Sequence, residues 1–412
     1  MYKSVSFSSF GTKDNVNIEA WRNKIDVPVF SQVGRRKVTL KYKPILAAVL
    51  VLLGITFFYH YSATSVEDDV NQHINPRFLG KEILPQRKLM SYNRTYPLTK
   101  PVATRTGSSF RIGIITDMDK ASKYPEKSNT WKSLLRYGNL SFDNQTLTAS
   151  VKWEDDDSEG KQLLSSYSYG GRGMELSELV VFNGHVYSVD DRTGIVYEIL
   201  DGRVAPWVIL SDGNGHETKG FKGEWMTIKD EKLYLGGLGK EWTTADGVVL
   251  HSNPQWIKTI DKDGAVTHLD WVPKYTAMQR ASGYEPPGYI IHESAVWSDV
   301  HKSWFFLPRR ASHEQYDEDL DELRATNILF QCSEDFSHIK VTRIGKLEHK
   351  ARGFSSFKFV PGTNDQVIVA LKTEELKGST RSYITAFTLS GQIVLPDQQI
   401  SSQYKFEGVE FL

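Results

Sequence analysis

The chain has 412 residues, of which 40% are hydrophobic and 12% aromatic, and its formal net charge is zero. This length is enough for one large domain with a sizeable core and additional segments. Because basic and acidic residues are equal in number, no overall positive field attracts nucleic acid, and we expect no nucleic-acid partner.

An apolar run near the N-terminus is the first element in chain order. Residues 45–59 carry no charge, and with their flanks they are just long enough to span a bilayer as a helix. Basic residues precede the run and acidic residues follow it, which indicates a cytoplasmic N-terminus and a lumenal remainder. A cleaved signal peptide is disfavoured because no clear small-residue cleavage site follows. We predict a cytoplasmic tail over 1–43 and a signal-anchor helix over 44–61, whose short span favours a thin early-secretory membrane.

Residues 62–104 are polar, contain four prolines and lack a hydrophobic period, so we predict a lumenal stalk. Three Asn-x-Ser/Thr triplets agree with a lumenal location and predict N-glycosylation at Asn93, Asn139 and Asn144. Cys332 is the only cysteine. The domain therefore folds without an internal disulfide, and the apolar neighbours of Cys332 predict a buried thiol.

Short strand-like runs joined by turn residues begin near Phe110 and continue to the C-terminus. Residues 179–182 and 185–189 flank Asn183-Gly184, which predicts a hairpin with a type I′ turn. Similar pairs of runs begin near residues 225, 294 and 356. Helical periodicity is weak, and 314–325 is the best helix candidate. We therefore assign 105–412 to one all-β domain.

An acidic or hydroxyl residue recurs just before, or at the start of, the strand-like runs. These phase markers are Asp117, Glu178, Glu224, Glu293, Ser355 and Glu407. Their spacing of 46 to 69 residues suits four-stranded blades with some enlarged loops. Six markers and five intervals predict a five-bladed β-propeller. The last strand, 404–412, would close the ring against the N-terminal strand.

The phase markers also predict a metal. In a radial fold, ligands at equivalent places in each blade meet near the axis. The predicted metal-binding set contains only oxygen donors: Ser177, Glu178, Glu224, Glu293, Ser355 and Glu407. Hard oxygen donors in a flexible cage suit Ca²⁺, and the sequence has no Cys or His pair at zinc spacing. The sequence thus predicts a central calcium site.

Asp117-Met-Asp119 follows a buried-looking strand and has three interpretations. A haloacid-dehalogenase-type phosphatase places a nucleophilic aspartate there, but requires alternating β and α elements afterwards. A glycosyltransferase uses Asp-x-Asp for a metal and a sugar nucleotide, after a nucleotide-binding half-domain. The β-hairpins downstream favour the third interpretation, two carboxylates at the mouth of a propeller, near a metal.

Phosphate recognition needs cations near these carboxylates, and four arginines lie beside the markers in segments that we interpret as loops: Arg172, Arg192, Arg309 and Arg310. The planar guanidinium suits phosphate. Gly236-Gly-Leu-Gly-Lys240 is followed by Glu241 rather than Ser or Thr, so no P-loop is present.

Several long motifs resemble one family, the soluble calcium-activated nucleotidases, which are the apyrases shared by vertebrates and blood-feeding arthropods. The motifs cover residues 172–178, 187–194, 236–242, 287–294, 304–312 and 353–359. The resemblance extends over about residues 90–412, and the membrane anchor resembles the vertebrate form.

The resemblance implies a five-bladed propeller with a central calcium and hydrolysis of nucleoside di- and triphosphates, with UDP and GDP preferred over ADP and ATP. It also implies a role in the ER or Golgi lumen, supporting glycosylation and proteoglycan synthesis. The family's calcium ligands match the predicted metal-binding set, although Glu178 stands where the vertebrate pattern has Asp. Asp117, Asp119, Asp191 and Arg309 match active-site positions.

Some alternatives stay open at this point. Asp117 and Asp119 are both candidates for the general base, and Arg309 is the candidate phosphate clamp. A propeller with paired carboxylates could also act on glycans or bind them. We expect a monomer or homodimer, and a soluble form is possible if the stalk is cleaved.

Overall fold

The computed structural model describes residues 29–33, 36–40, 56, 91–154 and 159–412. The chain divides into two units, Met1–Met90 and Ser91–Leu412. In the first unit, β1 (Val29–Val33) and β2 (Arg36–Leu40) form an antiparallel hairpin. Apart from Thr56, the predicted anchor helix lies outside the described residues, as does the predicted stalk up to residue 90. Among the helices that the structure describes, none is long and apolar enough to cross a membrane.

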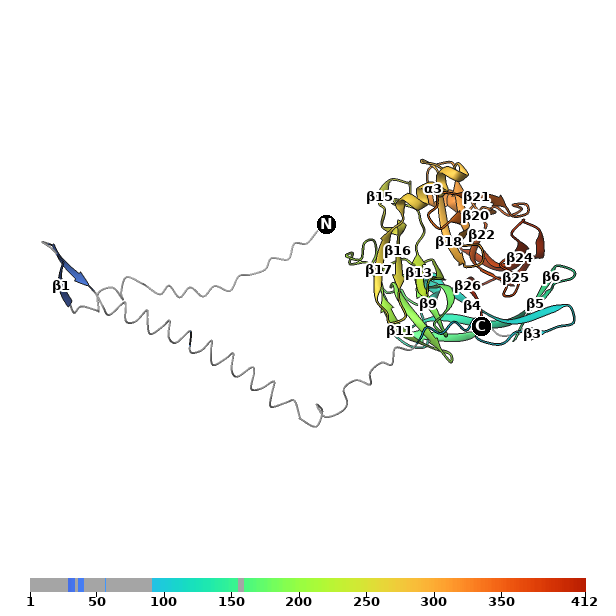
Figure 1. Cartoon of the computed structure of the whole chain (residues 1–412), viewed down its shortest axis with the longest axis horizontal. Coiled ribbons are helices and arrows are strands. Elements are labelled where there is room, and N and C mark those ends of the chain that lie inside the picture. The colour runs from blue at the N-terminus through green and yellow to red at the C-terminus, as the bar shows by residue number, and fades with distance from the viewer. Residues whose placement is uncertain (1–28, 34–35, 41–55, 57–90, 155–158) are drawn as a thin grey trace, which may run out of the picture. The chain divides into compact units, whose positions relative to one another are not determined.

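The second unit is a five-bladed β-propeller (Figure 1). Each blade is an antiparallel four-stranded sheet, with its strands named from the innermost outwards. Blade 1 is β26 (Lys405–Phe411), β4 (Gly107–Asp117), β5 (Trp131–Asp143) and β6 (Thr148–Trp153), and blade 2 is β8 (Leu176–Phe182), β9 (His185–Asp190), β10 (Ile195–Leu200) and β11 (Arg203–Ile209). Blade 3 is β12 (Trp225–Lys229), β13 (Lys232–Gly236), β16 (Trp256–Ile260) and β17 (Val266–Asp270). Blade 4 is β18 (Tyr289–Ser298), β19 (Ser303–Ser312), β20 (Ile328–Ser333) and β21 (Ile339–Arg343), and blade 5 is β22 (Arg352–Phe359), β23 (Val367–Leu376), β24 (Ser379–Thr388) and β25 (Ile393–Ser401).

The C-terminal strand closes the ring, as predicted. β26 is the innermost strand of blade 1 and pairs antiparallel with β4, which comes from the other end of the domain (Figure 1). Two short strands, β3 (Val102–Ala103) and β7 (Lys161–Ser165), extend the same blade. Closure leaves no blade with a missing strand, which is how a propeller keeps its unpaired edges short.

The innermost strands are not regular where the phase markers occur. The pairing of β8, β18, β22 and β26 with their neighbours shifts register at Ser177, Glu293, Ser355 and Glu407. Glu224 directly precedes β12, which is the remaining inner strand. A β-bulge bends a strand and re-aims the extra side chain. Four of the predicted metal-binding residues therefore lie at a break in the ladder, where side chains and carbonyls are free of the pleat.

Hydrophobic clusters fill the spaces between the blades. The cluster shared by blades 3 and 4 is rich in aromatic residues and contains Trp225, Trp304 and the buried Cys332. The prediction that Cys332 is buried is thus confirmed, and burial raises the pKa of its thiol to about 12. The turn between β8 and β9 has positive φ at Asn183 and Gly184, as a type I′ turn requires.

The helix prediction was confirmed only in part. The 314–325 segment contains only the short helix α4 (Glu318–Asp321), whereas an eleven-residue helix, α3 (Val272–Ser282), was missed. The signals for α3 are in the sequence: proline in the first turn, and Gly283 in the left-handed conformation after the last turn. The four-residue spacing from Tyr275 to Gln279 was too short a pattern to detect against the surrounding strands.

Candidate active site

A cleft of about 410 Å³ opens where the inner strands begin. The ends of β4 and β26 supply one wall, and the residues before β12 and the bulge of β18 supply others. Ten carboxylates and four cationic side chains line the cleft. The lining of the cleft therefore has a surplus of carboxylates, and several of them are buried from water. Such carboxylates are stabilised by cations in addition to those that the chain supplies.

Arg309 lies at the centre of one group of carboxylates. Its guanidinium is buried and forms ion pairs with Glu293, Glu375 and Glu407, the last at 2.9 Å. The pairing of β18 with β19 skips Arg309, since Ile291 pairs with Arg310 and His292 with Pro308. The strand-to-strand ladder therefore releases this arginine towards the carboxylates. The placement of Arg309 and Arg310 in loops was wrong, because both belong to β19.

Gly353 makes the close approach to Arg309 possible. A Cβ atom at this position would lie 2.5 Å from both Cγ and the backbone oxygen of Arg309. Gly408 has a corresponding role between β26 and β8, where a Cβ would lie 2.6 Å from the backbone nitrogen of Leu179. These two glycines thus let the inner strands pack closely around the carboxylates.

Two lysines connect the remaining carboxylates. Lys405 Nζ lies 2.8 Å from Asp117, 2.9 Å from Asp119, and 3.5 Å from both Glu375 and Glu407. Lys222 pairs with Asp191, and it lies 2.8 Å from Glu224. Each lysine is two residues before a phase marker, in Lys222-Gly-Glu224 and Lys405-Phe-Glu407. Neither lysine was recognised from the sequence, although this repeated spacing was a usable signal.

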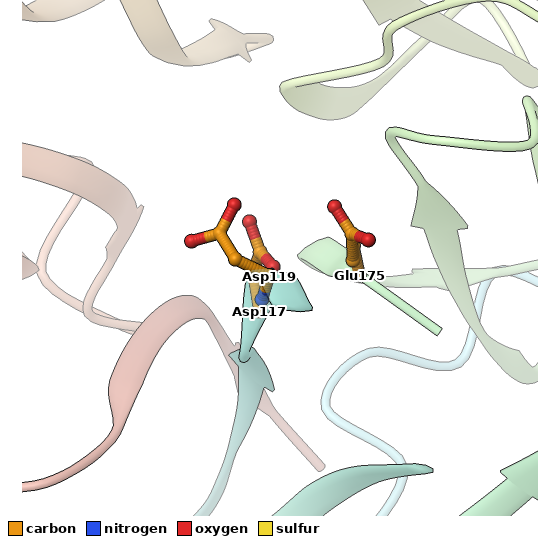
Figure 2. A group of neighbouring side chains, drawn as sticks. All are labelled: Asp117, Asp119 and Glu175. Atoms are coloured by element: carbon orange, nitrogen blue, oxygen red, sulfur yellow. The ribbon is translucent and has the colours of Figure 1, made fainter. Parts of the chain in front are cut away.

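Asp117, Asp119 and Glu175 form a compact group of carboxylates (Figure 2). One oxygen from each lies within 4.8 Å of the others. Arg172 Nη2 lies 3.0 Å from Asp119, and Arg172 Nε donates to Glu175 at 2.8 Å. Glu175 lies within one of the family motifs but was not recognised as a site residue, because its partner Asp117 is 58 positions away in the sequence.

Burial shifts the acidity of several of these carboxyls. It raises the pKa of Asp117 to about 6, that of Glu175 to about 7 and that of Glu224 to about 8, against the lysines or arginine beside them. Burial also acts against ionisation of Asp119, but Lys405, Lys222 and Arg172 outweigh it and lower its pKa. Two adjacent carboxyls with opposite shifts are typical of a site that handles protons.

The sequence comparisons agree with the motifs. The family model "Apyrase" matches residues 118–412. The chain is 48% identical to the "Soluble calcium-activated nucleotidase 1" of Rattus norvegicus over 362 residues, which are 88% of this chain and 87% of that protein. It is 46% identical to an "Apyrase" of Cimex lectularius over 78% of this chain and 87% of that protein. It is also 46% identical to "Apyrase apy-1" of Caenorhabditis elegans over 73% of this chain and 84% of that protein.

The chain belongs to the apyrase family. This membership confirms the family resemblance read from the motifs, and with it the enzyme class, a hydrolase that acts on nucleotide phosphates. The names of the rat relative and of a Mus musculus relative that is 50% identical over 80% of each chain include calcium activation, which agrees with the predicted cofactor. The family model begins one residue after Asp117, and so covers most of the propeller.

The structure brings the predicted apyrase active-site residues together. Asp117, Asp119, Asp191 and Arg309 all line the cleft, as do three of the predicted metal-binding carboxylates, Glu224, Glu293 and Glu407. Of the predicted phosphate-binding arginines, Arg172 contacts Asp119, and Arg310 lines the cleft. Arg310 Nη1 donates to the backbone oxygen of Ala351 at 3.1 Å, and the Arg192 guanidinium lies over the Tyr169 ring, 5.9 Å from its centroid.

The other three residues of the predicted metal-binding set lie deeper, inside the ring. Glu178 Oε1 accepts from Ser356 Oγ at 2.8 Å and lies 3.1 Å from Lys358 Nζ. Ser355 Oγ donates to the Phe406 carbonyl at 3.3 Å. Counting only partners among the described residues, Ser177 Oγ and Glu178 Oε2 are buried and have no hydrogen bond. Unsatisfied buried oxygens are costly, so these two atoms fit a site completed by a bound cation.

Proposed function

We propose that this chain is a calcium-dependent nucleotide phosphohydrolase that converts nucleoside diphosphates, UDP and GDP first, to the monophosphate and phosphate. Triphosphates are further substrates, and ADP and ATP are poor ones. The observation that carries the proposal is the cleft itself, in which Arg309, Lys405 and Lys222 are surrounded by a surplus of carboxylates. Membership of the apyrase family supports phosphate esters of nucleosides as the substrate class.

The residues present fit calcium. The predicted metal-binding set offers oxygen donors only, four of its members lie at strand bulges, a fifth directly precedes a strand, and two of its oxygens are orphaned inside the ring. Flexible oxygen cages of this kind favour Ca²⁺ over Zn²⁺. We propose that Ser177, Glu178, Glu224, Glu293, Ser355 and Glu407 hold the ion. When bound, calcium supplies positive charge to the phosphate oxygens.

The chain's own cations would orient the phosphates. Arg309 presents a planar fork with donors towards the cleft, and in the absence of substrate these donors pair with Glu293, Glu375 and Glu407. Phosphate is a strong acceptor for such a fork. Lys405 places a second charge between Asp117, Asp119 and Glu407. When a phosphate enters the cleft, its oxygens would replace these carboxylates as partners of Arg309 and Lys405.

Asp117 is the better candidate for the general base. Its carboxyl is buried, with a pKa raised to about 6, and the backbone N–H of Asp119 donates to Asp117 Oδ1 at 2.8 Å, which fixes its orientation. A base is most effective when its pKa lies near the working pH. We propose that Asp117 takes a proton from the attacking water as the phosphoanhydride bond breaks in line. Asp119, with a lowered pKa, remains ionised and holds Lys405 and Arg172.

Location in the ER or Golgi lumen and the type II anchor over 44–61 belong to the same proposal. They rest on the apolar run, the charge asymmetry around it and the three sequons. In that compartment the enzyme would remove the UDP and GDP that sugar transfer releases, and so support glycan and proteoglycan synthesis.

The test is phosphate release from UDP by the full-length protein, with calcium, with magnesium and after chelation of both. We expect UMP and phosphate to form with calcium and to stop on chelation. A folded protein that binds calcium but releases no phosphate from UDP, GDP or ADP would overturn the proposal. Release of sugar from a glycan by that protein would instead support the glycan-acting propeller.

A further inference from the structure

The carboxylate group of Asp117, Asp119 and Glu175 joins two blades (Figure 2). Asp117 ends β4, Asp119 begins the short 3₁₀ helix η1 (Asp119–Ser122), and Glu175 directly precedes β8. In Figure 2 the three carboxylates point into the same space from these two blades. Asp117 and Glu175 are 2% and 1% exposed, whereas the side chain of Asp119 is 48% exposed and opens to the cleft. The group is therefore buried on one side and accessible on the other.

A fourth carboxylate near this group, that of Asp191, has one oxygen without a partner among the described residues. Asp191 is 8% exposed, and its Oδ2 pairs with Lys222. Its Oδ1 is buried and, within the described part of the chain, accepts no hydrogen bond. Asp191 is close to the group, because its charge raises the pKa of both Asp117 and Glu175 and its backbone N–H donates to the Glu175 carbonyl at 3.0 Å. An orphaned carboxylate oxygen beside three other carboxylates calls for a cation.

This group is separate from the predicted metal-binding set around the ring. Lys405 Nζ stands between them, 2.8 and 2.9 Å from Asp117 and Asp119 and 3.5 Å from Glu407. Lys222 stands in the same way between Asp191 and Glu224. The two ammonium groups divide the carboxylates of the cleft into two sets, so that a single dication does not serve both.

We propose that, in the protein without nucleotide, Asp117, Asp119, Glu175 and Asp191 form a second divalent-cation site, distinct from the ring site. Four carboxylates and no nitrogen or sulfur donor define a hard-cation site. Calcium is the better fit, because Mg²⁺ usually keeps several waters and takes only one or two protein carboxylates. The half-exposed Asp119 provides the entry path from the cleft.

The cations already present are shared too widely to neutralise this group. Lys405 is divided among four carboxylates and Lys222 between two. Arg172 is the only one of the three whose described ion pairs all lie within the group, to Asp119 and Glu175. Three cationic side chains contact the four carboxylates of this group. A dication would supply the positive charge that these side chains do not.

The test is calcium binding to the full-length protein without nucleotide, measured as stoichiometry by isothermal titration calorimetry. We expect two Ca²⁺ per chain in the wild type and one in Glu175→Gln. Glu224 belongs to the predicted metal-binding set, so Glu224→Gln should weaken calcium binding at the ring site and leave the second site unchanged. Glu198→Gln is the matched control, since Glu198 lies on β10 and pairs with His185, and it should bind two ions.

Since Glu175→Gln removes a buried partner of Arg172, a thermal melt must show that the variant folds. If it does not fold, Asp119→Asn replaces it, because this half-exposed position tolerates the change; we expect at least tenfold weaker binding at the second site. One Ca²⁺ per chain in the wild type, two in a folded Glu175→Gln variant, or unchanged binding in Asp119→Asn would overturn the proposal. The readout contains no nucleotide, so its failure is distinguishable from failure of the phosphohydrolase proposal.

Discussion

At the cleft end of the inner strands, ten carboxylates surround four cationic side chains, whereas at the far end Lys358 lies near Glu178 and Glu410, whose oxygens accept further hydrogen bonds. There Glu178 accepts from Ser356 and the Leu179 N–H. Glu410 accepts from the Tyr96 hydroxyl at 2.8 Å and from the N–H groups of Val181 and Phe411. Burial raises carboxyl pKa values at both ends.

The far end also has the larger cavity, about 800 Å³ against about 410 Å³ for the cleft. Neither cavity size nor a raised carboxyl pKa therefore distinguishes the active site. What distinguishes the cleft is a surplus of carboxylates over cations that opens to solvent. At the far end both carboxyl oxygens of Glu410 accept hydrogen bonds, which is typical of structural networks.

The largest effect should come from Asp117→Asn. Removing the proposed base should lower kcat for UDP by about 10²- to 10⁴-fold, while the protein still folds. Steady-state kinetics with a melting curve check this. A kcat within a few-fold of wild type would remove Asp117 from the mechanism and make Asp119 the candidate base.

Arg309→Lys should have the next largest effect. Lysine keeps the charge but loses the fork that reaches Glu293, Glu375 and Glu407, so we expect kcat/KM for UDP to fall about 10²-fold. The neighbouring Arg310→Lys is the comparison, because Arg310 donates to the Ala351 carbonyl rather than to these carboxylates. Equal losses in the two variants would contradict the assignment of Arg309 as the phosphate clamp.

Calcium should stabilise the protein more as the pH rises. The carboxyl pKa values of the metal-free fold are raised to about 6 at Asp117, 7 at Glu175 and 8 at Glu224, against about 4 in an unfolded chain. The contribution of these three carboxyls to the free energy of unfolding is thus complete below about pH 4, where they are protonated in both states. It is lost as the pH rises through about 6 to 8, because the folded state then has to hold buried negative charge. Calcium binds the ionised carboxylates and offsets this loss. The increase in Tm on adding calcium should therefore grow from about pH 5 to about pH 8; a constant or shrinking increase would contradict this linkage.

The smallest effect should come from Tyr96→Phe at the far end. This change removes one hydrogen bond to Glu410, and should lower the free energy of unfolding by about 1 kcal/mol with kcat unchanged. Denaturant unfolding and UDP kinetics measure the two quantities. A large fall in kcat would show that the far end takes part in the chemistry, and the contrast between the two ends would fail.

The repeated oxygen residues predicted the blade count and the ring closure, because five of the six lie in the first half of an inner strand or directly before one, whereas Asp117 ends β4 beside the inner strand β26. The same pattern predicted Glu224, Glu293 and Glu407 as residues of one cleft. It did not reveal that Ser177, Glu293, Ser355 and Glu407 lie at register shifts, since a bulge depends on the pairing partner, which a single strand does not contain.

The missed residues share a different cause. Glu175, Glu375 and Lys405 act through partners on other blades, and their roles depend on how the ring brings β4, β23 and β26 together. Arg309 was recognised from its motif but placed in a loop, because Pro308 resembles a strand terminator. In the structure Pro308 is inside β19, next to the bulge that releases Arg309.

Whether the carboxylate ring holds the activating ion is tested by the calcium concentration that gives half-maximal UDP hydrolysis, compared between the wild type and Glu224→Gln. Glu318→Gln, which removes a charge from the rim of the same cleft outside the predicted metal-binding set, is the control. We expect Glu224→Gln to need at least about tenfold more calcium and Glu318→Gln to need no more than the wild type. The same calcium requirement in Glu224→Gln and the wild type would show that the ring does not hold the activating ion.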